Sequence, residues 1–189
     1  SKSRYLIMKF FETSKYFSLK KSIYINLRWI AIIGQLITIN LIYFIFDFKF
    51  DLILENSIIL IGILSNLYLI YINKNTQLLD KTAFLFLLID ILQLSCLIYL
   101  TGGIANPFAI FLIIPTIFSS SNLGLKSNLL LASITILIII FLTFFNQPLP
   151  YPVSEHFHVD SYYYYSIPIS LIIALIFLNY FALIFGKES

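Results

Sequence analysis

The stretch Gly102-Gly103-Ile104-Ala105-Asn106-Pro107-Phe108 lies between two apolar segments and carries no charge. Its first half suits the end of a helix, because glycine readily adopts a positive φ. Its second half suits the start of the next helix, with Asn106 as the N-cap and Pro107 in the first helical position. The stretch therefore predicts a tight hairpin between two helices, and the apolar flanks place that hairpin at a membrane surface.

The composition of the whole chain is that of a membrane protein. Of its 189 residues, 60% are hydrophobic and 11% are charged, and the mean hydropathy is +0.94. A soluble domain of this size could not cover so much apolar surface, so lipid is the solvent for most of it. The net charge of +3 is explained by orientation in the membrane, and no nucleic-acid partner is expected.

The fold class predicted from these patterns is an all-α membrane protein with six transmembrane helices. A spanning helix needs about 20 mostly apolar residues. The fourth candidate is short, so we expect it to be tilted, continued past Asn122, or packed away from lipid. The expected spans are Leu27–Phe46, Leu52–Ile72, Ala83–Leu100, Pro107–Ser121, Ser127–Asn146 and Tyr165–Phe185.

The distribution of basic residues predicts that both termini are cytoplasmic. With these spans, 11 of the 12 Lys and Arg residues fall on one side of the membrane and Lys49 alone falls on the other. Residues 1–26 then form a cytoplasmic segment, either an interfacial helix on anionic lipid or a disordered leader. Residues 27–186 form the six-helix transmembrane domain.

Enzyme and metal signatures are missing from the sequence. It has no phosphate-binding loop, no nucleophile elbow and no HExxH motif. Cys96 lies inside a span, where a thiol behaves as a small hydrophobe. His156 and His158 match no tight ligand spacing, so a solvated loop is the simpler interpretation and no metal is expected. The chain is therefore expected to bind or to sense rather than to catalyse.

Asp90 is the one ionisable residue near the middle of an expected span, and Gln93 continues its helix face toward the hairpin. Two readings remain open. Asp90 is either a neutral group that holds helices together through a hydrogen bond to Gln35, Asn66 or another helix, or it is functional, as intramembrane acids often are. It lies about 18 Å below Gly102, so the two are not expected to contact one compact head group.

The hairpin also has two readings: it turns the chain, or it binds a ligand. A resemblance favours the second. The segment from Asp90-Ile91-Leu92-Gln93-Leu94 through Tyr99-Leu100-Thr101 and the hairpin to Pro115 resembles the membrane domain of the RegB/PrrB/ActS family of redox-responsive sensor histidine kinases. Two further stretches agree, Leu27-Arg28-Trp29-Ile30-Ala31-Ile32-Ile33-Gly34-Gln35-Leu36 and Pro148-Leu149-Pro150. The family carries a GGxxNPF heptapeptide between its third and fourth transmembrane helices.

The resemblance implies a redox-sensing input domain in the bacterial inner membrane that binds ubiquinone at the heptapeptide. The residues that match the motif are Gly102, Gly103, Asn106, Pro107 and Phe108. It also implies a homodimer, and kinase domains after residue 189 that would bind ATP and pass the signal to a response regulator. Those domains are not in this chain.

A physical mechanism accompanies this expectation. The glycines would expose backbone N–H donors to the quinone oxygens, Phe108 would lie against the ring, and Pro115 would kink the fourth span and redirect movement inward. The competing interpretation is a small six-helix substrate-binding component of a membrane transporter. A structural subunit of a larger complex is a third.

Overall fold

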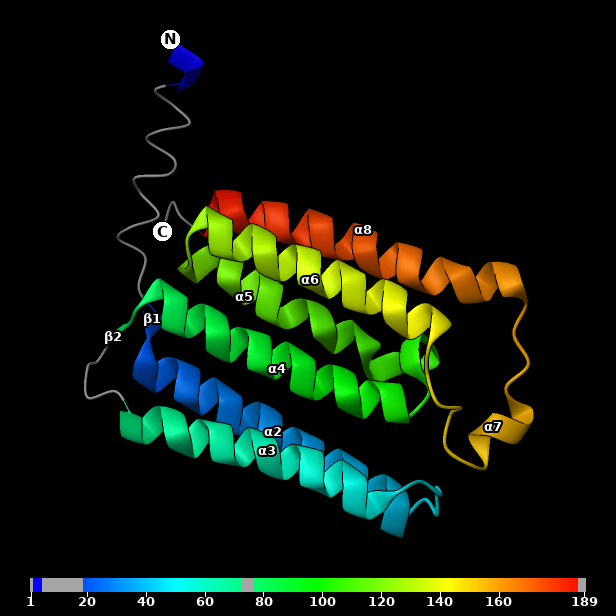
Figure 1. Cartoon of the computed structure of the whole chain (residues 1–189). Helices are drawn as coiled ribbons and strands as arrows, with labels where there is room; N and C mark the ends of the chain where they lie inside the picture. The colour runs from blue at the N-terminus through cyan, green and yellow to red at the C-terminus, as the bar shows by residue number, and fades with distance from the viewer. Residues whose placement is uncertain (1, 5–18, 73–76, 187–189) are drawn as a thin grey trace.

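The computed structural model describes residues 2–4, 19–72 and 77–186. Apart from two-residue strands, the regular elements of this part of the chain are helices (Figure 1). In chain order they are β1 Leu19–Lys20, α2 Lys21–Phe44, α3 Leu52–Ile72, β2 Gln77–Leu78, α4 Asp80–Leu100, η2 Gly103–Ala105, η3 Pro107–Ile113, α5 Ile114–Asn122, α6 Leu125–Phe144, α7 Val153–His156 and α8 Ser161–Phe185.

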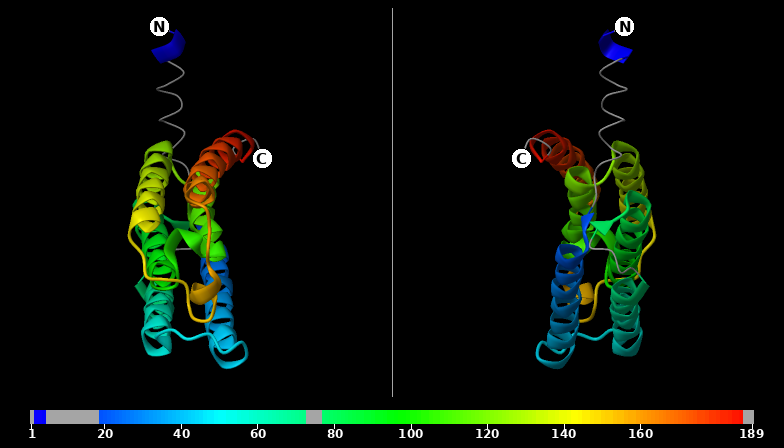
Figure 2. Two further views of the ribbon diagram at one scale, coloured as in Figure 1. Left: turned by 90° about the vertical axis from the view of Figure 1, so that its right-hand side faces the viewer. Right: turned by 90° about the vertical axis from the view of Figure 1, so that its left-hand side faces the viewer.

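The long helices form two layers that run side by side. One layer holds α3, α4 and α6, and the other holds α2, α5 and α8 (Figures 1 and 2). The start of α2 and the end of α8 lie at the same end of the bundle, where β1 pairs with β2 through Leu19 opposite Leu78. Four lysines lie at this end, at or beside the starts of α2, α4 and α6, namely Lys20, Lys21, Lys81 and Lys126. Lys49 lies in the turn at the other end. That the first end faces the cytoplasm stays a prediction.

In the described part of the chain, five helices are long and apolar enough to cross a membrane, namely α2, α3, α4, α6 and α8. Many of their large apolar side chains are exposed, among them Ile30, Ile53 and Phe177, as expected where lipid is the solvent. The first of these helices begins at Lys21 instead of Leu27, so Arg28 lies two turns inside a helix and not at its cytoplasmic end. Of the 1–26 segment expected to hold an interfacial helix, residues 5–18 lie outside the described residues.

The outer half of the short fourth span is a 3₁₀ helix. Pro115 has no N–H with which to bond the carbonyl oxygen of Phe111, and the N–H of Ile114 bonds it instead in the 3₁₀ pattern. From Ile114 the chain is α-helical and ends at Asn122. Thr116, Ser119 and Ser120 are buried against neighbouring helices. Continuation past Asn122 is therefore wrong, and the span packs away from lipid on one face only, because Ile110 and Ile114 on its other face are exposed.

Candidate functional site

The hairpin after α4 has the backbone conformation that its glycines predict. Gly102 has φ +109° and Gly103 has φ +59°, both in the left-handed region that favours glycine. The N–H of Ala105 bonds the carbonyl of Gly102, and the N–H of Asn106 bonds that of Gly103, at 3.3 and 3.0 Å. The turn therefore uses its own N–H groups to close itself.

The side-chain amide of Asn106 holds the hairpin together through both its oxygen and its nitrogen. Its Oδ1 accepts a hydrogen bond from the N–H of Phe108 at 2.9 Å, which confirms the predicted N-cap. Its Nδ2 donates to the hydroxyl of Thr101 at 2.9 Å, and that hydroxyl donates to the carbonyl of Leu97. The Asn106 amide thus links the end of α4 to the start of η3.

This arrangement predicts the effect of Asn106→Asp. The carboxylate keeps the cap on Phe108 but opposes an acceptor, the Thr101 hydroxyl, whose own proton is already donated to Leu97. We expect a loss of about 1–3 kcal/mol in unfolding free energy. Thermal unfolding in detergent measures it, with Gln147→Glu as the control because that exposed amide lies on the same surface. Equal stability of the two variants would contradict the assigned bond.

The two glycines are covered, which corrects the expectation that they expose N–H donors. A Cβ on Gly102 would lie 2.3 Å from Cδ2 of Leu149, and one on Gly103 would lie 2.3 Å from Cβ of Asn146. The end of α6 and the loop after it close over the turn, with the N–H of Gln147 bonded to the carbonyl of Tyr99. The glycines are needed because a second segment packs directly on them.

The exposed part of the heptapeptide is its aromatic end. Phe108 is 43% exposed and Phe111 is 46% exposed, and their rings stack with centroids 5.9 Å apart. Ala109 and Leu112, on the opposite side of the same helix, are buried. The start of η3 therefore presents a flat aromatic surface to lipid beside an ordered turn.

A small hollow of about 130 Å³ lies between the hairpin and the loop that covers it. It is lined by Gly102 and Ala105 of the heptapeptide, by the 146–157 region and by Tyr164 of α8. The Tyr164 hydroxyl donates to the carbonyl of Thr143 at 2.6 Å, so it fixes α8 against the end of α6. The hollow is below the roughly 300 Å³ at which small-molecule pockets begin.

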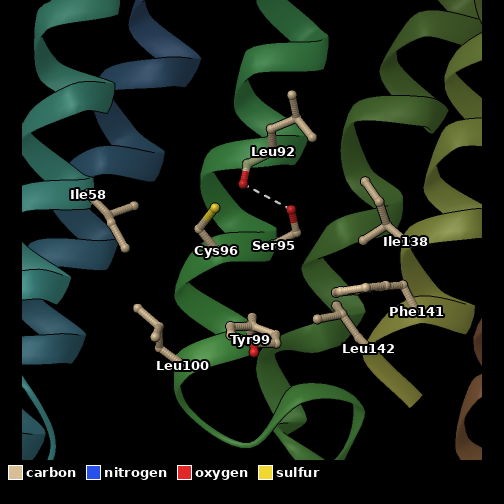
Figure 3. Close-up of a pocket in the computed structure, with 9 residues that line it drawn as sticks. All are labelled: Ile58, Leu92, Ser95, Cys96, Tyr99, Leu100, Ile138, Phe141 and Leu142. Carbon is tan, nitrogen blue, oxygen red and sulfur yellow. Dashed lines mark hydrogen bonds between the residues drawn. The ribbon is translucent and has the colours of Figure 1, made fainter. Parts of the chain in front are cut away.

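A larger groove of about 450 Å³ crosses α4 between α3 and α6, in the outer half of the bundle (Figure 3). Its walls are almost entirely hydrocarbon, and the hydroxyl of Ser95 is bonded to the carbonyl of Leu92 in its own helix. Cys96 lies in this groove and is exposed. The groove suits an acyl or isoprenoid chain better than a polar head group.

Asp90 forms an ion pair that the sequence did not predict. Arg28 on α2 contacts Asp90 Oδ1 through Nη2 at 2.8 Å and through Nε at 2.9 Å. The Tyr24 hydroxyl donates to Oδ2 at 2.6 Å. Arg28 Nη1 donates to Asn66 of α3, and Nη2 also donates to the hydroxyl of Ser65 on the same helix. Asp90 therefore bonds neither Gln35 nor Asn66, but the expected link to another helix is present, as an ion pair instead of a contact between neutral groups. This Arg28 cluster ties α2, α3 and α4 together.

Two amide pairs continue the polar contacts of α2 toward the outer end. Gln35 and Gln93 exchange two hydrogen bonds, at 3.0 and 2.7 Å, between α2 and α4. Asn40 and Asn56 do the same between α2 and α3, at 3.1 and 3.2 Å. Gln93 thus has a structural partner, and the stripe from Asp90 toward the hairpin is satisfied within the bundle.

Glu55, one turn into α3, was missed by the sequence reasoning. Its side chain is 1% exposed, and neither carboxyl oxygen has a hydrogen-bond partner in the described part of the chain. Its spacing in the sequence could have indicated burial. Glu55 is the one acidic residue of α3, and it lies four residues before Ile59, on the same buried face of the helix. Among the described residues, no group of His, Cys, Asp and Glu side chains could hold a metal ion.

An all-helical bundle with an apolar exterior, paired polar groups inside and a capped outer hairpin is a multi-pass inner-membrane protein. Comparison with known proteins then identifies its family: residues 21–184 match the PilS-like transmembrane domain, and the chain belongs to that family. The family describes six transmembrane helices, which agrees with five long helices and the shorter η3–α5 pair.

A known relative supports the family resemblance stated from the sequence. The chain is 27% identical over 159 residues to the sensor histidine kinase RegB of Cereibacter sphaeroides. The match covers 84% of this chain and 34% of RegB, so the chain spans about a third of that protein. The expected relation to the RegB/PrrB membrane sensor domains is confirmed. No solved structure matches the chain significantly.

Proposed function

We propose that this chain is the membrane input domain of a sensor histidine kinase, and that it reports the redox state of ubiquinone bound at the outer hairpin. Two observations support the kinase assignment, the family match and the likeness to RegB. The observation that carries the quinone assignment is the exposed Phe108–Phe111 surface at the end of a rigidly held heptapeptide.

The residues present fit a quinone on one surface only. A quinone ring needs flat apolar contact, and its isoprenoid tail needs lipid. The 130 Å³ hollow is too small for a substituted ring, whereas the Phe108–Phe111 surface faces lipid and accepts one from the side. Bound quinone would supply two carbonyl oxygens that become hydroxyls on reduction. Phe108 holds the ring, and Gly102, Gly103, Asn106 and Pro107 fix the backbone that carries Phe108.

A route from the hairpin to the inner end of the bundle runs through α5. This helix follows η3 directly, with Pro115 at the junction, and packs against α6 and α8. Its last turn meets the end of α8, where a Cβ on Gly186 would lie 3.0 Å from Oγ of Ser121. A ligand with unequal affinity for two packings of η3 would shift their populations, and α5 would carry the shift to α8. A kinase after α8 would receive it in the cytoplasm and pass it to a response regulator.

The transporter interpretation has less support. A water-soluble substrate needs a polar cavity, yet most of the polar groups inside the described bundle pair with one another and the larger groove is apolar. The homodimer expected of the family remains a proposal, and the lipid-facing surfaces of α2 and α8 leave room for one.

Phe108→Ala tests the quinone site. The substitution removes one aromatic contact from a half-exposed position and leaves the turn intact, so we expect about fivefold weaker binding of a short-chain ubiquinone and an unchanged melting temperature. The measurement is equilibrium binding to the 189-residue chain in lipid nanodiscs, with oxidised and with reduced quinone.

Cys96→Trp is the matched control, because it fills the groove on the other layer and should leave the affinity at the wild-type value. Weaker binding in Cys96→Trp together with normal binding in Phe108→Ala would move the site to the groove. No binding to the wild-type chain would contradict the quinone proposal altogether.

A further inference from the structure

The groove across α4 is a cavity to which the proposed function gives no role. Its volume of about 450 Å³ lies within the roughly 300–1,000 Å³ of typical ligand pockets. The short side chains of Ser95 and Cys96 leave room on α4 between Ile58 of α3 and Ile138 of α6 (Figure 3). A ligand in the groove is therefore contacted by three helices.

The end of the groove nearer the hairpin has an aromatic wall and one hydroxyl. The ring of Tyr99 stacks on that of Phe141 with centroids 6.2 Å apart, and Phe141 stacks on Phe145 at 5.1 Å. Tyr99 is half-buried and lines the groove, and its hydroxyl has no hydrogen-bond partner among the described residues. The hydroxyl of Ser95 is already bonded to the carbonyl of Leu92. Tyr99 therefore carries the one hydroxyl that this lining offers to a ligand.

The position of the groove in the membrane matches one leaflet. Its lining on α4 runs from Leu92 to Leu100, about 12 Å along the helix axis. The hydrocarbon core is about 30 Å thick, so one leaflet contributes about 15 Å. Leu100 is the last residue of α4, which places Tyr99 near the membrane surface, where tyrosine hydroxyls meet the polar part of lipids. A chain that begins beside Tyr99 and follows the groove ends near the middle of the membrane.

We propose that the groove is a binding site for one acyl chain of a phospholipid from the leaflet nearer the hairpin. The Tyr99 hydroxyl donates to the ester carbonyl of that chain, and Cys96 and Ile138 contact its methylene groups. A quinone fits less well here, because its second ring oxygen would lie among hydrocarbon walls without a donor. An acyl chain has no polar atom beyond its ester. This inference is independent of the proposed function.

Two kinds of contact hold the chain in the groove. Lipid tails are as apolar as the lining, so transfer of a chain from the bilayer gains no hydrophobic free energy. The site therefore depends on packing against three helices and on the hydrogen bond from Tyr99. Each can be removed by one substitution: Cys96→Trp fills the groove, and Tyr99→Phe removes the hydroxyl and keeps the ring.

A photoreactive phospholipid tests the site. The 189-residue chain is placed in nanodiscs of dioleoyl phosphatidylcholine that contain a small fraction of the same lipid with a diazirine in the middle of one acyl chain. Peptide mass spectrometry maps the adducts. We expect more adduct on the groove residues of α4 and α6 than on Ile173 and Phe177 of α8. These two are the internal control, because they are 62% and 63% exposed on a surface of the same chain without a groove.

The variants separate a specific site from ordinary lipid contact. Cys96→Trp should abolish the groove adducts and leave those on α8 unchanged, and it should keep the quinone affinity. Tyr99→Phe should reduce the groove adducts about fivefold. Tyr180→Phe is its matched control, because Tyr180 is exposed on α8 and its hydroxyl lies outside the groove.

Three outcomes would overturn the proposal. Equal adduct on the groove and on α8 in the wild-type chain would make the groove an ordinary lipid-facing surface. Groove adducts that Tyr99→Phe leaves unchanged would remove the hydrogen bond that defines the bound chain. Displacement of the groove adducts by short-chain ubiquinone would make the groove a quinone site. Failure of quinone binding at Phe108, measured separately, leaves the lipid site intact.

Discussion

Asp90→Asn should destabilise the bundle by about 3–5 kcal/mol, among the largest effects expected of a single substitution in this chain. Asp90 accepts both contacts from Arg28 and one from Tyr24, and Arg28 is 4% exposed. An amide in place of the carboxylate leaves the guanidinium buried without its counter-charge. The sequence reading that treats Asp90 as a neutral group predicts the opposite, a harmless substitution.

A second variant isolates the charge from the shape. Arg28→Gln combined with Asp90→Asn puts two neutral amides in place of the ion pair, and we expect it to regain much of the stability that Asp90→Asn loses. Thermal and denaturant unfolding in detergent compare the variants. Asp160→Asn is the control, because Asp160 is an exposed N-cap and asparagine caps as well as aspartate. A stable Asp90→Asn variant would mean that Arg28 and Asp90 are not paired in the membrane.

The sequence predicted the helices and the hairpin because both are encoded locally. Apolar length determines the spans, and the caps at Gly102 and Asn106 depend on residues within the turn. The sequence predicted that the fourth span is short, but not that its outer half is a 3₁₀ helix. Pro115 has no N–H to donate to the carbonyl of Phe111, so the α-helical hydrogen bond there is missing. A 3₁₀ turn is one of several backbone conformations that accommodate a missing bond of this kind.

The polar interior could not be predicted residue by residue, because its contacts join distant parts of the chain. Arg28 and Asp90 are 62 residues apart, and counting Arg28 as a cytoplasmic charge concealed it. One signal was available: an Arg and an Asp, each inside a span and each two to three turns from its inner end, are natural partners. Glu55 and the covered glycines needed the packing of α3 on α4 and of the fifth loop on the hairpin.

Gly103→Ala should cost about 2–4 kcal/mol, since it combines two penalties at the centre of the heptapeptide. The residue has φ +59°, a conformation that alanine adopts only with strain. The new Cβ would also lie 2.3 Å from Cβ of Asn146, close to the backbone where the contact cannot be relieved by rotating a side chain. Asn146 in turn is held by its Nδ2, which donates to the carbonyl of Leu142 and to the hydroxyl of Tyr164.

Gly34→Ala is the matched control for Gly103→Ala. Gly34 lies within α2 with no atom within 4 Å of an added Cβ, so alanine there should stabilise the protein by about 0.5–1 kcal/mol. Adding Asn146→Gly to Gly103→Ala removes the overlap but not the strained φ, and should return only part of the loss. Melting temperatures in detergent then separate the two penalties. If Gly103→Ala unfolds at the wild-type temperature, the loop after α6 does not cover the heptapeptide, and its glycines are free to meet a ligand after all.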